Sequence, residues 1–264
     1  VWAIGVGGSV AKELVYSARE YLAMPEYSPD GKWLAYTADD DAKSINLRLL
    51  NLTTGASVDL TTGPHVNHEP AWSPDGKRLA YVSTAPNGYF NVYVMDIVDG
   101  KPGKSVQITT DNSFGRDRLY FGDVDVHISP AFSPDGRELL LVSNRGIPLG
   151  SGGIWRVPVE ANVMTTPRAK LIHKEETLYR TRPQWSPDGK RMVYASHLGG
   201  QYTELFVLPT VGGEPYKMTF SGHGASTSAS TTPHRPNAAR PRATRCSLSE
   251  ARTIERRRAP GNEA

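Results

Sequence analysis

The sequence repeats one four-residue phrase, Ser-Pro-Asp-Gly, four times. In every copy an aromatic residue stands directly before the Ser, and a Pro stands two positions before that aromatic residue. A cationic residue and then an apolar run follow the Gly. The copies recur about every 45 to 60 residues, which is a period typical of propellers and solenoids. They are Ser28, Pro29, Asp30 and Gly31; Ser73, Pro74, Asp75 and Gly76; Ser133, Pro134, Asp135 and Gly136; and Ser186, Pro187, Asp188 and Gly189.

Each copy of the phrase predicts a tight turn between two neighbouring antiparallel strands. Pro presets the backbone angle at the second position of the turn, Asp tolerates the third, and Gly takes the left-handed conformation. The apolar run after each turn is nearly continuous, as in Leu34-Ala35-Tyr36, so the strand that it forms should be covered on both faces. The turn chemistry explains the four Asp residues without any catalytic role.

Two further strands, separated in most copies by a Gly-bearing linker, follow each turn and its apolar run, and the N-terminus supplies one such pair alone. No helical period is evident before residue 220. We therefore predict an all-β fold, an incomplete β-propeller of four-stranded antiparallel blades with a disordered C-terminal tail. A half blade should occupy residues 1–20, and whole blades about 21–62, 63–110, 125–173 and 178–220, with an insertion at 111–129.

Charge is distributed unevenly along the chain. Residues 221–264 hold 8 of the 30 Lys and Arg residues but only 3 of the 27 Asp and Glu residues. The basic balance therefore belongs to this segment and does not make residues 1–220 a nucleic-acid binder. The segment is rich in Ser, Thr, Ala, Pro and Arg and has no aromatic residue. We interpret it as a disordered basic tail, or as an out-of-frame translation.

The only Cys, Cys246, lies in that tail, so disulfides and Cys metal sites are excluded from residues 1–220. No apolar run is long enough to span a membrane. None of the seven His residues forms a His-x-His pair, and we interpret His65 and His68 as polar residues at the rim of a blade. The nearest approach to a Gly-x-Ser-x-Gly nucleophile motif surrounds Ser9 and lacks its last Gly. We predict no catalytic residue and no cofactor, so the chain itself should not be an enzyme.

Asp123, Asp125 and His127 are weak candidates for a metal site. They alternate in the sequence, so on a strand their side chains would face one way, and Asp and His are reasonable cation ligands. We nevertheless predict no metal here, and interpret these residues as part of a solvated loop at the rim of the propeller.

The motif Pro-x-aromatic-Ser-Pro-Asp-Gly-(Lys/Arg) resembles the repeat of TolB-like, WD-related β-propellers, and its copies cover nearly all of residues 1–220. Such propellers occur in the periplasmic TolB component of the Tol–Pal system, in prolyl oligopeptidase-type serine peptidases, and before metal-dependent amidohydrolase domains. Residues 125–146 and 182–199 are most similar to the amidohydrolase-associated group.

This resemblance implies a non-catalytic scaffold or protein-interaction region within a larger bacterial amidohydrolase-type protein, whose catalytic domain would lie outside this chain. The alternatives are a stand-alone TolB-like interaction protein of the envelope and the propeller of a serine peptidase. The expected partner is another domain of the parent chain or an envelope protein, with no nucleic acid and no membrane span. The expected location is periplasmic or secreted.

Overall fold

The computed structural model describes residues 1–5, 10–39, 44–110, 112, 125–145, 152–174, 181–197 and 202–220. Contacts divide the chain into two units, Val1–Pro233 and His234–Ala264, and every described residue belongs to the first. The predicted tail at residues 221–264 and most of the predicted insertion at residues 111–129 lie outside the described residues.

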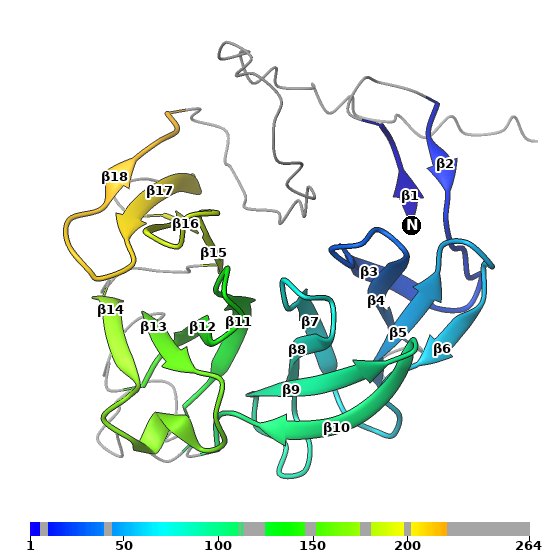
Figure 1. The fold of residues 1–264 in the computed structure, drawn as a ribbon, viewed down its shortest axis with the longest axis horizontal. Helices are drawn as coiled ribbons and strands as arrows, with labels where there is room; N and C mark the ends of the chain where they lie inside the picture. The colour runs from blue at the N-terminus through cyan, green and yellow to red at the C-terminus, as the bar shows by residue number, and fades with distance from the viewer. Residues whose placement is uncertain are drawn as a thin grey trace, which may run out of the picture. The chain divides into compact units, whose positions relative to one another are not determined.

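Four antiparallel sheets of four strands each follow one another along the chain, and in each the strands lie side by side in sequence order. Figure 1 shows them arranged in sequence around a common centre. Neighbouring sheets contact one another through their first strands. The predicted all-β propeller with four whole blades is therefore confirmed. Blade 1 is β3 (Tyr21–Tyr27), β4 (Trp33–Asp39), β5 (Ile45–Asn51) and β6 (Ser57–Asp59); blade 2 is β7 (Asn67–Trp72), β8 (Arg78–Ser83), β9 (Asn91–Val98) and β10 (Lys101–Gln107). Blade 3 is β11 (His127–Phe132), β12 (Glu138–Ser143), β13 (Gly153–Pro158) and β14 (Lys170–Lys174); blade 4 is β15 (Thr181–Trp185), β16 (Arg191–Ser196), β17 (Glu204–Pro209) and β18 (Tyr216–Lys217).

The N-terminal half blade is a two-stranded sheet of β1 (Trp2–Ala3) and β2 (Lys12–Glu13). Apolar residues beside these strands, Val1, Leu14 and Val15, pack against the buried residues Leu34 and Tyr36 of blade 1.

The Ser-Pro-Asp-Gly phrase forms the same turn in all four blades. In blade 1 the Ser28 hydroxyl donates to Asp30 Oδ1 at 2.6 Å, and the Trp33 backbone N–H donates to Ser28 Oγ at 2.9 Å. The Gly31 N–H donates to the Ser28 carbonyl at 2.9 Å, and Gly31 has a φ of 70°. The other three copies repeat this network. Gly is required at the last position because its backbone is left-handed.

The hydrophobic core lies between neighbouring blades. The second strand of each blade is almost fully buried, as the continuous apolar runs predict. Between blades 1 and 2, Leu47 and Leu49 pack with Trp72 and Leu79. The Trp72 indole N–H also donates to the Glu26 carbonyl of blade 1 at 3.2 Å, and Trp185 donates to the Ala131 carbonyl at 3.0 Å. Each fully buried Leu side chain contributes roughly 1.5–3 kcal/mol of transfer free energy.

One element departs from the repeat. A short 3-10 helix, η1 (Val163–Thr165), lies between β13 and β14, where other blades have a Gly-bearing linker. Val163 and Met164 are buried in the core between blades 2 and 3. Two apolar side chains, five and six positions after the end of β13, do not form a helical period, so the sequence pattern does not indicate this turn.

Candidate functional site: a polar cluster at the inner strands

A left-handed residue interrupts the innermost strand of every blade. Each repeat has a Pro two positions before its aromatic residue, and the residue directly before that Pro has a positive φ in all four copies. The strand pairing shifts register at the same place. A residue before Pro normally prefers extended backbone, and a non-Gly residue in the left-handed region costs roughly 1–2 kcal/mol. Such strain persists only where surrounding structure imposes it. The four residues are Met24 (49°), Glu69 (53°), Ser129 (56°) and Arg182 (48°).

Two of these residues join blade 2 to blade 3. Glu69 Oε2 accepts the backbone N–H of Ser129 at 2.6 Å, and the Ser129 hydroxyl lies 3.4 Å from Glu69 Oε1. Ser129 is buried and only 15% of the Glu69 side chain is exposed. A backbone N–H bonded to a carboxylate is a charge-assisted hydrogen bond, stronger than one between neutral groups. Glu69 therefore tethers the left-handed backbone of the next blade.

Glu26 of blade 1 has an unusual titration. Burial raises the pKa of Glu26 to about 7, and the positive charge of Arg182 opposes that rise. Arg182 belongs to blade 4 and Glu26 to blade 1, so this charge acts between the first and the last of the four whole blades. The Glu26 carboxyl group therefore changes its charge near neutral pH.

The charges of Glu69 and Arg182 both act on His68. Burial lowers the pKa of the His68 imidazole; the Glu69 carboxylate raises it and the Arg182 charge lowers it. Its Nδ1 lies 3.9 Å from Glu69 Oε2, and its ring meets Phe90 edge to face with centroids 5.5 Å apart. Among the described residues, Nδ1 has no hydrogen-bond partner. We call Glu26, His68, Glu69, Ser129 and Arg182 the axial cluster.

The axial cluster is suited to binding rather than to nucleophilic chemistry. An activated Ser needs a general base against its hydroxyl, with a third group orienting the base. Here the group beside the Ser129 hydroxyl is the carboxylate of Glu69. The imidazole of His68 is near that carboxylate and not near the hydroxyl. The part of the chain that the structure describes holds no group of three His, Cys, Asp or Glu side chains able to bind a metal ion.

The candidate metal ligands Asp125 and His127 are not exposed in a loop at the rim of the propeller. Asp125 and His127 are both fully buried, so the solvated-loop interpretation is wrong for these two residues. The Arg145 guanidinium lies 4.0 Å from Asp125 Oδ2, so a protein cation stands beside this carboxylate. Asp123 lies outside the described residues, and the absence of a metal at this place stays a prediction.

Sequence reasoning placed His68 at a blade rim and did not single out Glu26, Glu69 or Arg182. His68 is instead a half-buried residue of β7, on the innermost strand of blade 2. One feature of the sequence indicates this position: the residue before the first Pro of each repeat is polar in three of the four copies. The sixteen residues of the turn phrases lie at the opposite end of the inner strands and are used in their turns.

The sequence matches a known protein family. The model of the TolB beta propeller domain matches residues 7–166, more than half of the chain. The chain belongs to this family. It is 29% identical over 100 residues to the uncharacterized peptidase YuxL of Bacillus subtilis, a match that covers 37% of this chain and 14% of YuxL.

Two solved structures share the TolB-type fold at low identity. TolB from Acinetobacter baumannii matches with a TM-score of 0.63 and 22% identity, over 83% of this chain and 48% of that one. A puromycin-hydrolyzing peptidase of Mycobacterium tuberculosis matches with a TM-score of 0.51 and 16% identity, over 80% of this chain and 30% of that one. The chain thus spans less than half the length of each of these proteins. In the described part of the TolB-type propeller, no helix has the length and apolarity needed to cross a membrane.

Proposed function

We propose that this TolB-type propeller is a non-catalytic scaffold that binds another protein domain over its axial cluster. The supporting observation is that four consecutive blades each hold a left-handed residue at the same inner position, while its side chain differs from blade to blade. A shared strained backbone with varied side chains is expected where the fold presents specific groups to a partner. Glu69 and Arg182 supply opposite charges for recognising such a partner.

The proposed partner is another domain of a larger parent protein. A serine-peptidase parent is supported by the likeness to YuxL and to the puromycin-hydrolyzing peptidase, both longer than this chain. An amidohydrolase-type parent rests on the sequence resemblance of residues 125–146 and 182–199 alone. The second candidate, a stand-alone TolB-like protein docking to an envelope protein, is favoured by the family match and the TolB structure. We propose a periplasmic or secreted location, no nucleic-acid partner and no cofactor.

Enzyme assays test the non-catalytic part of the proposal. The full 264-residue chain is assayed for hydrolysis of peptide and amide substrates, with and without added zinc. We expect no rate above buffer. Metal-dependent amide hydrolysis, or peptide cleavage removed by a serine-directed inhibitor, would overturn the proposal.

A binding titration tests the partner. The chain is titrated with the purified remainder of its parent protein, using calorimetry. Arg182→Ala and Glu69→Gln should each weaken the affinity by at least about tenfold, because removing one partner of a buried, hydrogen-bonded charge pair costs roughly 2–5 kcal/mol. Asp96→Asn, at an exposed residue of β9, is the matched control and should leave the affinity unchanged. Equal affinity in all three variants would contradict binding over the axial cluster.

A further inference from the structure

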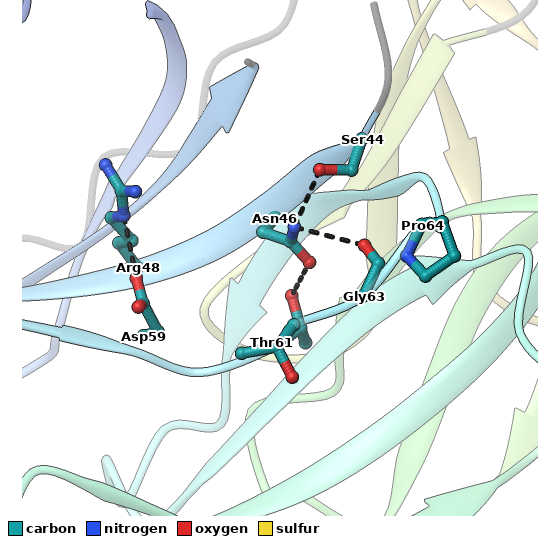
Figure 2. A pocket seen from close by; sticks show the side chains of 8 residues that line it. Ser44, Asn46, Arg48, Asp59, Thr61, Gly63 and Pro64 are labelled. Carbon is teal, nitrogen blue, oxygen red and sulfur yellow. Dashed lines mark hydrogen bonds and ion pairs between the residues drawn. The ribbon is translucent and has the colours of Figure 1, made fainter.

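A polar cavity lies in blade 1, on the outer two strands and the segment that leaves them. Its volume is about 390 Å³, near the lower end of the range for small-molecule sites. Figure 2 shows Asn46 and Thr61 in its wall, with Arg48 and Asp59 side by side at one end. We call it the blade-1 pocket; it is lined by Ser44, Asn46, Arg48, Asp59, Thr61, Thr62, Gly63 and Pro64.

Comparison of equivalent positions shows that blade 1 departs from the repeat here. In each blade, one residue from each of the second, third and fourth strands is paired directly with the next across the sheet, and the three residues form a row. The third-strand member is aromatic in blades 2, 3 and 4, and its ring stacks on a tyrosine in blades 2 and 4. In blade 1 that member is a guanidinium. The rows are Tyr36, Arg48 and Asp59; Tyr81, Tyr93 and Gln107; Leu141, Trp155 and Leu171; and Tyr194, Phe206 and Lys217.

The charges of the blade-1 pocket are held in fixed positions. Arg48 donates from Nη1 and Nη2 to the two carboxylate oxygens of Glu20 at 2.6 and 2.8 Å, and from Nε to Asp59 Oδ1 at 2.7 Å. These bonds engage all three nitrogens of the guanidinium. Glu20 does not itself line the pocket, but with Asp59 it places two carboxylates on one cation, so the three groups together carry a net charge of about −1 at neutral pH. Asp59 is the accessible acid, because 55% of its side chain is exposed.

The neutral wall of the blade-1 pocket is also built in advance. Asn46 Nδ2 donates to Ser44 Oγ at 3.1 Å and to the Gly63 carbonyl at 3.4 Å. Asn46 Oδ1 accepts from the Thr61 hydroxyl at 3.1 Å and from Asn67 Nδ2 at 3.2 Å. Side chains fixed by such bonds keep a polar cavity open and reduce the ordering cost of binding.

We propose that the blade-1 pocket binds a small hydroxylated amine, such as an amino sugar. The ligand's ammonium group would bind the Asp59 carboxylate, whose net acidic surroundings disfavour an anion and favour a cation. Its hydroxyl groups would bind the Thr62 hydroxyl and the Gly63 carbonyl in the polar wall. The aromatic rings of blades 2 and 4 would deny those blades an equivalent site. This proposal does not depend on the axial cluster.

Calorimetric titration of the full chain with glucosamine tests the proposal, at mildly acidic pH where the amine is protonated. Glucose is the neutral comparator, since it has a hydroxyl in place of the ammonium group. We expect glucosamine to bind at least about tenfold more tightly than glucose, a difference of roughly 1.4 kcal/mol or more. Equal binding of the two sugars, or no binding of glucosamine, would overturn the proposal.

Three variants locate the binding. Asp59→Asn should weaken glucosamine binding by about tenfold or more, since it removes the charge and keeps the shape. The double variant Arg48→Tyr and Asp59→Gln gives blade 1 the residues of blade 2 and should abolish binding while the circular dichroism spectrum stays unchanged. Asp96→Asn should bind as the parent chain does. Undiminished binding by Asp59→Asn would place the ligand elsewhere and refute the site.

Discussion

The turn that follows each inner strand and the left-handed residue within that strand differ in how closely the four blades resemble one another. At the turn end, Ser73 and Asp75 make the same bonds as their counterparts in the other three blades. Toward the other end, four residues before each turn Ser, the left-handed backbone recurs, but its side chain is Met24, Glu69, Ser129 or Arg182. Repeated bonds at one end serve the fold that all blades share. Varied side chains on a repeated backbone leave the other end available for a specific function.

The pKa shifts of the turn carboxyl groups and of Glu26 have opposite directions. Hydrogen bonds from the turn serines lower the pKa of Asp30, Asp135 and Asp188. Burial raises the pKa of Glu26 to about 7. The ionised form is therefore favoured in the turns and disfavoured at Glu26. Acid should weaken the first region, and rising pH should weaken the second.

The largest expected effect comes from breaking the packing beside a turn. Trp72 is buried between blades 1 and 2 and donates its indole N–H to Glu26. Trp72→Ala should lower the free energy of unfolding by about 3–5 kcal/mol, because it opens a large cavity. Trp72→Phe retains most of the ring and should cost about 1–2 kcal/mol. Urea unfolding measures both, and equal losses would show that the hydrogen bond matters more than the packing.

The next effect tests the axial end. The raised pKa of Glu26 means that its contribution to stability is complete below pH 4.5 and is lost as the pH rises to about 7. Glu26→Gln cannot ionise, so it should stabilise the protein above pH 7 by up to about 3 kcal/mol relative to the parent chain. The two chains should converge near pH 4.5. Urea midpoints across this range provide the measurement, and parallel pH curves would contradict the burial of Glu26.

A smaller effect compares two copies of the turn. The Ser73 hydroxyl is fully buried, whereas the Ser186 turn is more exposed. Ser73→Ala leaves the Arg78 N–H without its acceptor and should cost about 1–3 kcal/mol. Ser186→Ala should cost less, because water can replace the lost hydroxyl. Thermal unfolding of the two variants decides the matter; a greater loss in Ser186→Ala would count against burial as the cause.

The smallest effect is the acid response of the turns. The lowered pKa of Asp135 contributes stability above its ordinary value of 3.8 that is lost as the pH falls through the lowered value. Asp135→Asn should remove part of this acid dependence, by at most a few tenths of a kcal/mol because the group is exposed. Unfolding midpoints compared at neutral and acid pH check this, and an unchanged acid response in the variant would argue against the Ser133 bond.

The blades could be predicted from the sequence because a turn is a local structure. Pro, Asp and Gly fix the backbone of four consecutive residues, and the following apolar run fixes a buried strand. The axial cluster could not be predicted in this way. Glu26 and Arg182 are far apart in the sequence, and the influence of one charge on the other depends on the arrangement of blades. Asp125 was interpreted as solvated because it is polar, but Arg145 stands beside it and allows a buried carboxylate.

The central claim is that the inner strands bring buried ionisable groups of different blades together. The pKa of the Glu26 carboxyl, followed by carbon-detected NMR in the folded chain, tests this claim most directly. We expect a value of about 7, raised further in Arg182→Ala because the opposing charge of blade 4 is gone. A value near the ordinary 4.5, unaltered by Arg182→Ala, would contradict it.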